Sequence, residues 1–123
     1  MTDPNLLILY VDNAPASTAF YADLLGRSPV EASPAFAMFA LESGLLLGLW
    51  ARNMVEPATP TTGGGTELAF SVASAEAVDA RHDDWRRRGL TIAQAPVAMD
   101  FGYTFVALDP DGHRLRVYMP SAT

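Results

Sequence analysis

The strongest constraint on the fold of this chain is an internal repeat. One order of elements, strand, helix, strand, strand, strand, occurs in residues 5–52 and again in residues 66–120. Residues 53–65 lie between the two copies and are rich in Pro, Thr and Gly, which is typical of a linker. The sequence therefore predicts one domain, residues 1–123, in an α+β fold of two tandem βαβββ modules.

The first copy begins with an apolar run at residues 6–11, which predicts a buried strand. Asn13 is a good helix cap, and Gly26 suits the end of the helix that follows. Three further strands are predicted at residues 30–32, 36–41 and 45–50.

The second copy has a predicted strand at residues 67–72 and a helix that Ser74 caps and Gly89 ends. Three more strands are predicted at residues 91–93, 103–108 and 114–118. Equivalent positions are 61, 63, 67 and 68 residues apart for the pairs Leu6/Glu67, Gly26/Gly89, Leu41/Leu108 and Gly48/Arg116. This drift in one direction fits a second copy that has a few extra loop residues.

Composition restricts the function classes. Fourteen acidic and eight basic residues give a net charge of −6, which disfavours nucleic acid and anionic membranes and favours a cationic ligand. The chain has no cysteine, so disulfides, zinc–cysteine sites and thiol nucleophiles are excluded. The sequence shows neither a signal-peptide pattern nor an apolar run of about 18 residues, so we expect a cytoplasmic protein with no membrane or nucleic-acid partner.

Two motifs resemble those of a known superfamily. They are YVDN at residues 10–13 with FYADLLG at residues 20–26, and DPDGHRL at residues 109–115. In these residues the chain resembles the vicinal oxygen chelate superfamily, which includes glyoxalase I, extradiol dioxygenases and the bleomycin-resistance proteins. The resemblance extends from Leu6 to Pro120. It implies the α+β glyoxalase/bleomycin-resistance fold, in which the two modules form cupped mixed sheets with helices on the outer face.

The enzymes of that superfamily hold a divalent metal with one residue from the first and last strand of each module. The resemblance places these positions at Leu6, Gly48, Glu67 and Arg116. Only Glu67 can bind a metal, and Arg116 brings a permanent positive charge to the place of the cation. We therefore expect no metal, no cofactor and no catalytic residue in this chain.

Strand alternation predicts which side chains share a face with those four positions. These are Leu6, Ile8, Tyr10, Leu46, Gly48, Trp50, Glu67, Ala69, Ser71, Arg114, Arg116 and Tyr118. Through the Leu41-to-Leu108 offset, Phe36 is paired with Tyr103 and Met38 with Phe105, so that both modules present a large side chain at the same place. We expect ligand contacts from Trp50, Phe36, Met38, Tyr103, Phe105, Glu67, Arg116, Tyr10, Gly48, Ser71 and Tyr118.

Two alternatives remain for these side chains. The aromatic residues occupy either the ligand cavity or the core, since both environments favour them. Glu67 and Arg116 either pair with each other or orient the polar groups of a ligand.

The resemblance is to the drug-binding branch, whose members include the bleomycin- and phenazine-resistance proteins. It implies a metal-independent protein that sequesters a planar aromatic or cationic antibiotic or toxin. One alternative is a metal-dependent lyase or dioxygenase with an atypical ligand set, for instance Glu67 and His113 with water. Another is a structural or regulatory dimer whose cup is filled by its own side chains. The resemblance also implies a homodimer with composite pockets, and it leaves open whether modules are exchanged between chains.

Overall fold

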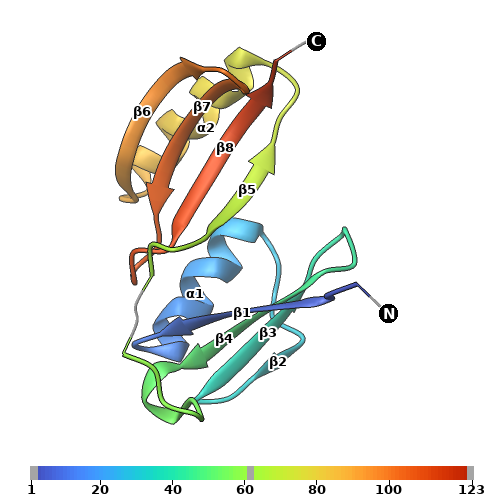
Figure 1. The fold of residues 1–123 in the computed structure, drawn as a ribbon, viewed down its shortest axis with the longest axis vertical. Helices are drawn as coiled ribbons and strands as arrows, with labels where there is room; N and C mark the ends of the chain where they lie inside the picture. The colour runs from blue at the N-terminus through green and yellow to red at the C-terminus, as the bar shows by residue number, and fades with distance from the viewer. Residues whose placement is uncertain (1–2, 61–62, 122–123) are drawn as a thin grey trace. The chain divides into compact units, whose positions relative to one another are not determined.

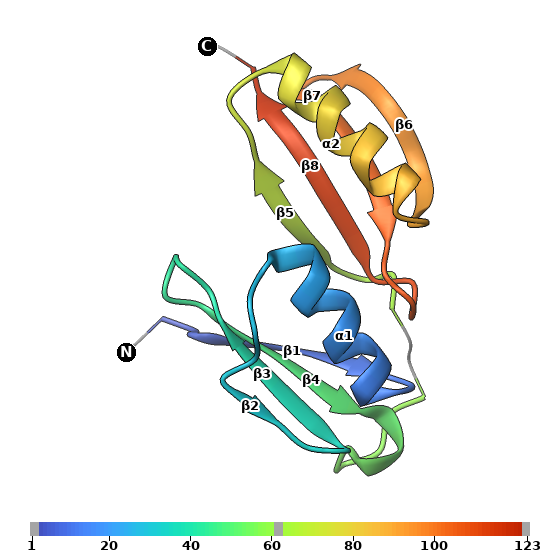
Figure 2. The ribbon, with the colours of Figure 1, turned by 180° about the vertical axis from the view of Figure 1, so that it is seen from behind.

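The computed structural model describes residues 3–60 and 63–121. The chain divides into two compact units, Met1–Thr62 and Gly63–Thr123. In each unit one helix packs on one face of a four-stranded mixed sheet (Figure 1, Figure 2). This arrangement confirms the predicted pair of βαβββ modules. Of the predicted linker, Thr61 and Thr62 lie outside the described residues.

The first unit contains five regular elements and a short 3-10 turn. They are β1 (Leu6–Val11), α1 (Ala14–Leu25), β2 (Glu31–Ala32), β3 (Phe36–Ala40), β4 (Leu46–Ala51) and η1 (Arg52–Met54). The strand order is β1-β4-β3-β2, and only the β1 and β4 pair is parallel. The predicted caps are present: Asn13 Oδ1 accepts a hydrogen bond from the Ala16 amide at 3.0 Å, and Gly26 ends the helix at a φ of 64°.

The second unit repeats this order. Its elements are β5 (Glu67–Ser71), α2 (Ala75–Arg87), β6 (Thr91–Met99), β7 (Gly102–Leu108) and β8 (Arg114–Pro120). The strand order is β5-β8-β7-β6, with β5 and β8 parallel. Ser74 Oγ accepts a hydrogen bond from the Ala77 amide at 3.1 Å and caps α2 as predicted. No helix among residues 3–60 and 63–121 is long and apolar enough to cross a membrane.

The core of each unit lies between its sheet and its helix. In the first unit Leu9, Leu47 and Leu49 are at most 4% exposed. In the second, Trp85 of α2 meets Phe105 of β7 edge to face, with ring centres 5.5 Å apart. Each such side chain contributes about 1.5–3 kcal/mol on burial, so these helix-facing layers hold the helices on the sheets.

Strand β6 is longer than the sequence predicts. We expected residues 91–93, and the strand runs to Met99 with irregular pairing between Ile92 and Gln94 and between Gln94 and Val97. It is an edge strand, where Pro96 does not interrupt a ladder because one side of the strand needs no partner. The loop expected before β7 therefore shrinks to a tight turn at Asp100 and Phe101.

One part of the predicted alignment of the two modules is wrong by one residue. Met38 pairs with Gly48, and Val106 pairs with Arg116, so both strand pairs keep an offset of 68 residues rather than 67. The reason is that residues 41–45 and 109–113, which connect the paired strands, have equal lengths, so no drift occurs there. A slip of one residue moves side chains to the opposite face of a sheet.

Candidate ligand-binding site

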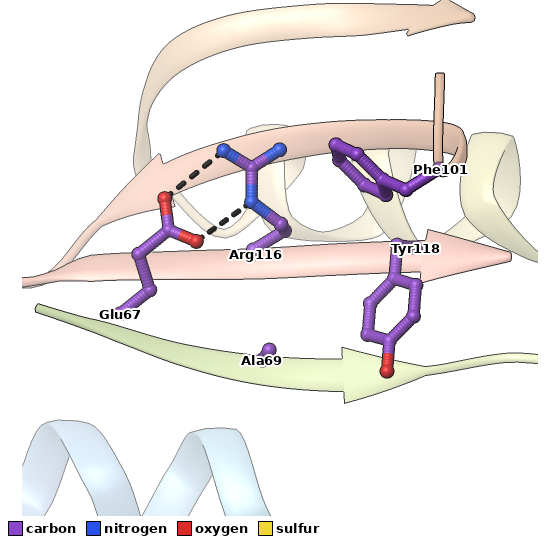
Figure 3. Close-up of a pocket in the computed structure, with 5 residues that line it drawn as sticks. All are labelled: Glu67, Ala69, Phe101, Arg116 and Tyr118. Atoms are coloured by element: carbon purple, nitrogen blue, oxygen red, sulfur yellow. Dashed lines mark hydrogen bonds and ion pairs between the residues drawn. The ribbon is translucent and has the colours of Figure 1, made fainter. Parts of the chain in front are cut away.

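A cavity lies on the face of the second sheet that points away from α2. Its volume is about 350 Å³, and its lining residues are Glu67, Ala69, Phe101, Arg116 and Tyr118 (Figure 3). Volumes of this size are typical of sites for small organic molecules. Strands β5 and β8 supply four of the five residues, and the turn between β6 and β7 supplies Phe101.

A forked ion pair forms one end of the cavity. Arg116 Nε donates to Glu67 Oε1 at 2.8 Å, and Arg116 Nη2 donates to Glu67 Oε2 at 3.0 Å. These hydrogen bonds, more than any other interaction, lower the pKa of Glu67 and raise the pKa of Arg116. Of the two roles left open by the sequence, the structure shows that the two side chains pair with each other.

Two further contacts fix the guanidinium group of Arg116. Nη1 donates to Thr104 Oγ1 at 3.1 Å, and this hydroxyl donates in turn to the Val117 carbonyl at 2.8 Å. The guanidinium carbon lies 5.4 Å from the centre of the Phe101 ring, and Figure 3 shows the group between this ring and the Glu67 carboxylate. Arg116 is therefore held in one orientation before any ligand arrives.

The opposite end of the cavity is aromatic. The rings of Phe101 and Tyr118 meet edge to face, with centres 6.3 Å apart and planes at 72°. Phe101 is 44% exposed, which leaves much of its ring open to a ligand. Ala69 has only a methyl group and so leaves room between the two ends.

Phe101 was missed as a site residue because it lies between the predicted strands at residues 91–93 and 103–108, where strand alternation assigns no face. The signal that could have identified it is a large aromatic side chain in a tight turn, where no core position is available. Ser71 shares the cavity face through its pairing with Tyr118, although it does not line the cavity.

The remaining predicted residues of the first module share one face of the first sheet. Phe36 pairs with Trp50 across β3 and β4, and the Tyr10 and Trp50 rings lie 6.4 Å apart at 74°. A Cβ atom at Gly48 would lie 3.3 Å from two ring carbons of Phe36, so the glycine lets this ring lie across β4. Met38 pairs with Gly48 and points to the same face.

Tyr103 and Phe105 lie on the wrong side of the second sheet for the predicted role. Phe105 is fully buried against Trp85 and His82 of α2. Tyr103 donates from its hydroxyl to Asp79 Oδ1 of α2 at 2.7 Å, which raises the pKa of Tyr103. Thr104 and Val106 take their place on the cavity side, so the prediction for Tyr103 and Phe105 is corrected.

The residues at the implied metal positions do not fit a divalent ion. Leu6 and Gly48 have no side-chain donor, and both carboxylate oxygens of Glu67 are bound by Arg116. Within residues 3–60 and 63–121, no three acidic or histidine side chains gather closely enough to hold a metal. His113 is 8% exposed and lies in the turn before β8, where its backbone amide donates to Asp109 Oδ1.

Comparisons with known proteins cover nearly the whole chain. The model of the Glyoxalase/Bleomycin resistance protein/Dioxygenase superfamily matches residues 4–117. The phenazine antibiotic resistance protein EhpR of Enterobacter agglomerans is 29% identical over 117 residues, which are 93% of this chain and 89% of the relative.

Two solved structures show the same fold. The solution NMR structure of protein ATC0852 from Agrobacterium tumefaciens is 54% identical, with a TM-score of 0.92 over 99% of this chain and 100% of that one. The crystal structure of a glyoxalase/bleomycin resistance protein/dioxygenase family enzyme from Burkholderia phytofirmans PsJN is 25% identical, with a TM-score of 0.83 over 98% of this chain and 100% of that one.

Proposed function

The chain belongs to the Glyoxalase/Bleomycin resistance protein/Dioxygenase superfamily, and we propose that it binds a planar aromatic compound without a metal and confers resistance by sequestering it. The observation that supports this most is the Glu67–Arg116 pair, which occupies two of the implied metal positions beside the rings of Phe101 and Tyr118. The likeness to a phenazine antibiotic resistance protein supports the resistance class.

Sequestration requires binding and no catalysis. It needs no nucleophile and no acid–base pair, only a dissociation constant below the working concentration of the toxin. Stacking on an aromatic ring adds about 0.5–1.5 kcal/mol beyond the burial of apolar area. Phe101 is exposed and lies in the cavity wall, so it is the residue best suited to this contact.

The protein acts as a homodimer in this proposal, as the family resemblance implies. Leu6 and Ile8, on the sheet face of the first unit that points away from α1, are 38% and 36% exposed, and a second copy would cover such apolar side chains. Light scattering coupled to size-exclusion chromatography tests this part, with twice the chain mass expected and the monomer mass contradicting it.

The binding itself is tested by isothermal titration calorimetry of phenazine into protein treated with a chelator. Saturable binding is expected, with the same affinity when Mg²⁺ or Zn²⁺ is added back. Phe101→Ala should weaken this binding, whereas Val30→Ala, which truncates a 62% exposed side chain of the first unit, should not. Binding that appears only after a metal is restored would favour the metalloenzyme alternative.

A further inference from the structure

The strands around the cavity of the second unit have a net positive charge, opposite in sign to that of the chain, and Arg116 in the cavity has unused hydrogen-bond donors. From this we infer that the cavity prefers planar aromatic compounds that bear a carboxylate over neutral and cationic ones with the same rings. The inference rests on the proposed function and names the chemical class of its ligand. It makes Arg116 the residue that determines specificity.

The local charge follows from the strand register. On the sheet face that points away from α2, the strand positions hold three charged side chains, Glu67, Arg114 and Arg116. The Glu67 carboxylate lies 2.8 Å from Arg116 and 4.0 Å from Arg114, so one negative charge faces two positive charges. Arg114 and Asp100, the latter in the turn beside Phe101, are both exposed, and neither lines the cavity. The lining itself has one carboxylate and one guanidinium, and the strand positions of this face have a net charge of +1 because Arg114 lies beside the cavity.

The hydrogen-bonding groups point to the same class of ligand. A guanidinium has five N–H donors, and Arg116 uses three of them on Glu67 and Thr104. The Tyr118 hydroxyl makes no hydrogen bond with the described residues. The cavity thus offers unused donors, while its one carboxylate already accepts from Arg116. A carboxylate on the ligand would accept from these donors, whereas an ammonium would have to compete with Arg116 for Glu67.

At contact distance the charge of Arg116 outweighs the net charge of the chain. The net charge is −6, but exposed charges separated by more than about 8 Å are largely screened at physiological ionic strength. A ligand carboxylate in the cavity would lie at hydrogen-bonding distance from Arg116, where the Coulomb energy is much larger. The net charge therefore acts on the rate of approach, and Arg116 acts on the selectivity of the bound state.

The guanidinium of Arg116 is already ordered in the absence of a ligand. Glu67, Thr104 and Phe101 hold its guanidinium in place, so a ligand does not have to order a long side chain. The Phe101 ring lies beside the same guanidinium, so one ligand could stack on the ring and place a carboxylate next to Arg116 (Figure 3).

Three probes that share one ring system and differ in charge test the preference for an anion. Acridine-9-carboxylate, acridine and 9-aminoacridine are the anion, the neutral ring and the cation at pH 7.5, and calorimetry gives the affinity of each. We expect the anion to bind at least about tenfold more tightly than the other two, since one charged hydrogen bond supplies that much. Equal affinities, or tightest binding of the cation, would overturn the charge preference and leave the proposed function standing. No binding of any of the three would overturn both.

Matched variants test whether Arg116 causes the preference for the anion. Arg116→Gln should weaken the binding of the anion by about 10- to 100-fold and leave the affinity for acridine nearly unchanged. Arg87→Gln removes the same charge from an exposed position on α2, outside the cavity, and should change neither affinity. An equal loss of affinity for the anion in both variants would show that the preference comes from the net charge of the chain, which would overturn the inference.

A second variant acts in the opposite direction and does not depend on the folding of Arg116→Gln. Glu67→Gln removes the competing carboxylate and frees Arg116, so the anion should bind about tenfold more tightly. Unchanged or weaker binding of the anion by folded Glu67→Gln would show that Arg116 serves the fold alone, which contradicts the inference.

Discussion

Arg116 and Glu67 join strands β8 and β5 through two hydrogen bonds, at 2.8 and 3.0 Å, at two of the positions where the family resemblance implies metal ligands. The two strands are parallel, and Arg116 pairs directly with Ala69, two residues beyond Glu67. Side chains of a strand alternate between its two faces, so Glu67 and Ala69 lie on the same face of the sheet as Arg116. The arginine side chain is long enough to contact the Glu67 carboxylate. The guanidinium of Arg116 thereby brings a permanent positive charge to one of these positions.

The pair makes stability depend on pH in a defined direction. The folded state lowers the pKa of Glu67 from its ordinary value of 4.5, chiefly through the Arg116 hydrogen bonds. The stabilisation is therefore complete above pH 4.5 and is lost as the pH falls through the lowered pKa. Thermal melts from pH 7 to pH 3 should show Glu67→Gln less stable than the wild type at pH 7, with the gap closing below pH 4.5. A gap that is constant over this range would contradict the pairing.

Phe101 and Phe105 should respond to truncation in opposite ways. Phe105→Ala opens the core under α2 and should cost about 3–5 kcal/mol in the free energy of unfolding. Phe101→Ala removes an exposed ring and should change stability by about 0.5 kcal/mol or less. Urea denaturation measures both, and phenazine affinity should fall only for Phe101→Ala when it is measured under conditions where both variants are folded. The reverse pattern would restore Phe105 to the cavity.

Gly102 should be essential to the turn that presents Phe101. Its φ is 147°, and a Cβ atom there would collide with the backbone carbonyl oxygen of Met119. Gly102→Ala should therefore destabilise the protein by roughly 1–3 kcal/mol and weaken phenazine binding. Gly65→Ala is the control, because a Cβ atom at Gly65 meets nothing within 4 Å. Similar melting temperatures for Gly102→Ala and the wild type would show that the close approach is not needed.

Much of the fold follows from local signals in the sequence. The caps at Asn13 and Ser74 and the apolar run at residues 6–11 fix elements that depend mainly on neighbouring residues. The extension of strand β6 from residue 93 to Met99 was not predicted because Pro96 opposes a strand, and only the edge position of β6 permits one. The length of an edge strand is set by long-range pairing, which local patterns do not encode.

The candidate site was predicted in part. Alternation placed Glu67, Arg116 and Tyr118 on one face, because these strands have a period of two and start at clear boundaries. Tyr103 was assigned to the wrong face of the second sheet because the assignment relied on an alignment of the two modules. The sequences of the modules have diverged, and an error of one residue in their alignment moves a side chain to the opposite face. Phe101 was missed because a turn has no periodicity from which its direction could be predicted.

In the proposed function, a planar aromatic compound binds beside Phe101, Arg116 and Tyr118 without a metal. Two-dimensional ¹H–¹⁵N NMR of chelator-treated, labelled protein tests it most directly, because the Arg116 Nε–H, bound to Glu67 at 2.8 Å, and the Phe101 amide both report from the site. Titration with phenazine should shift both signals saturably, while those of α1 residues such as Ala16 stay in place. Unmoved Phe101 and Arg116 signals at saturating phenazine, or shifts that require an added divalent ion, would contradict metal-independent binding at this site.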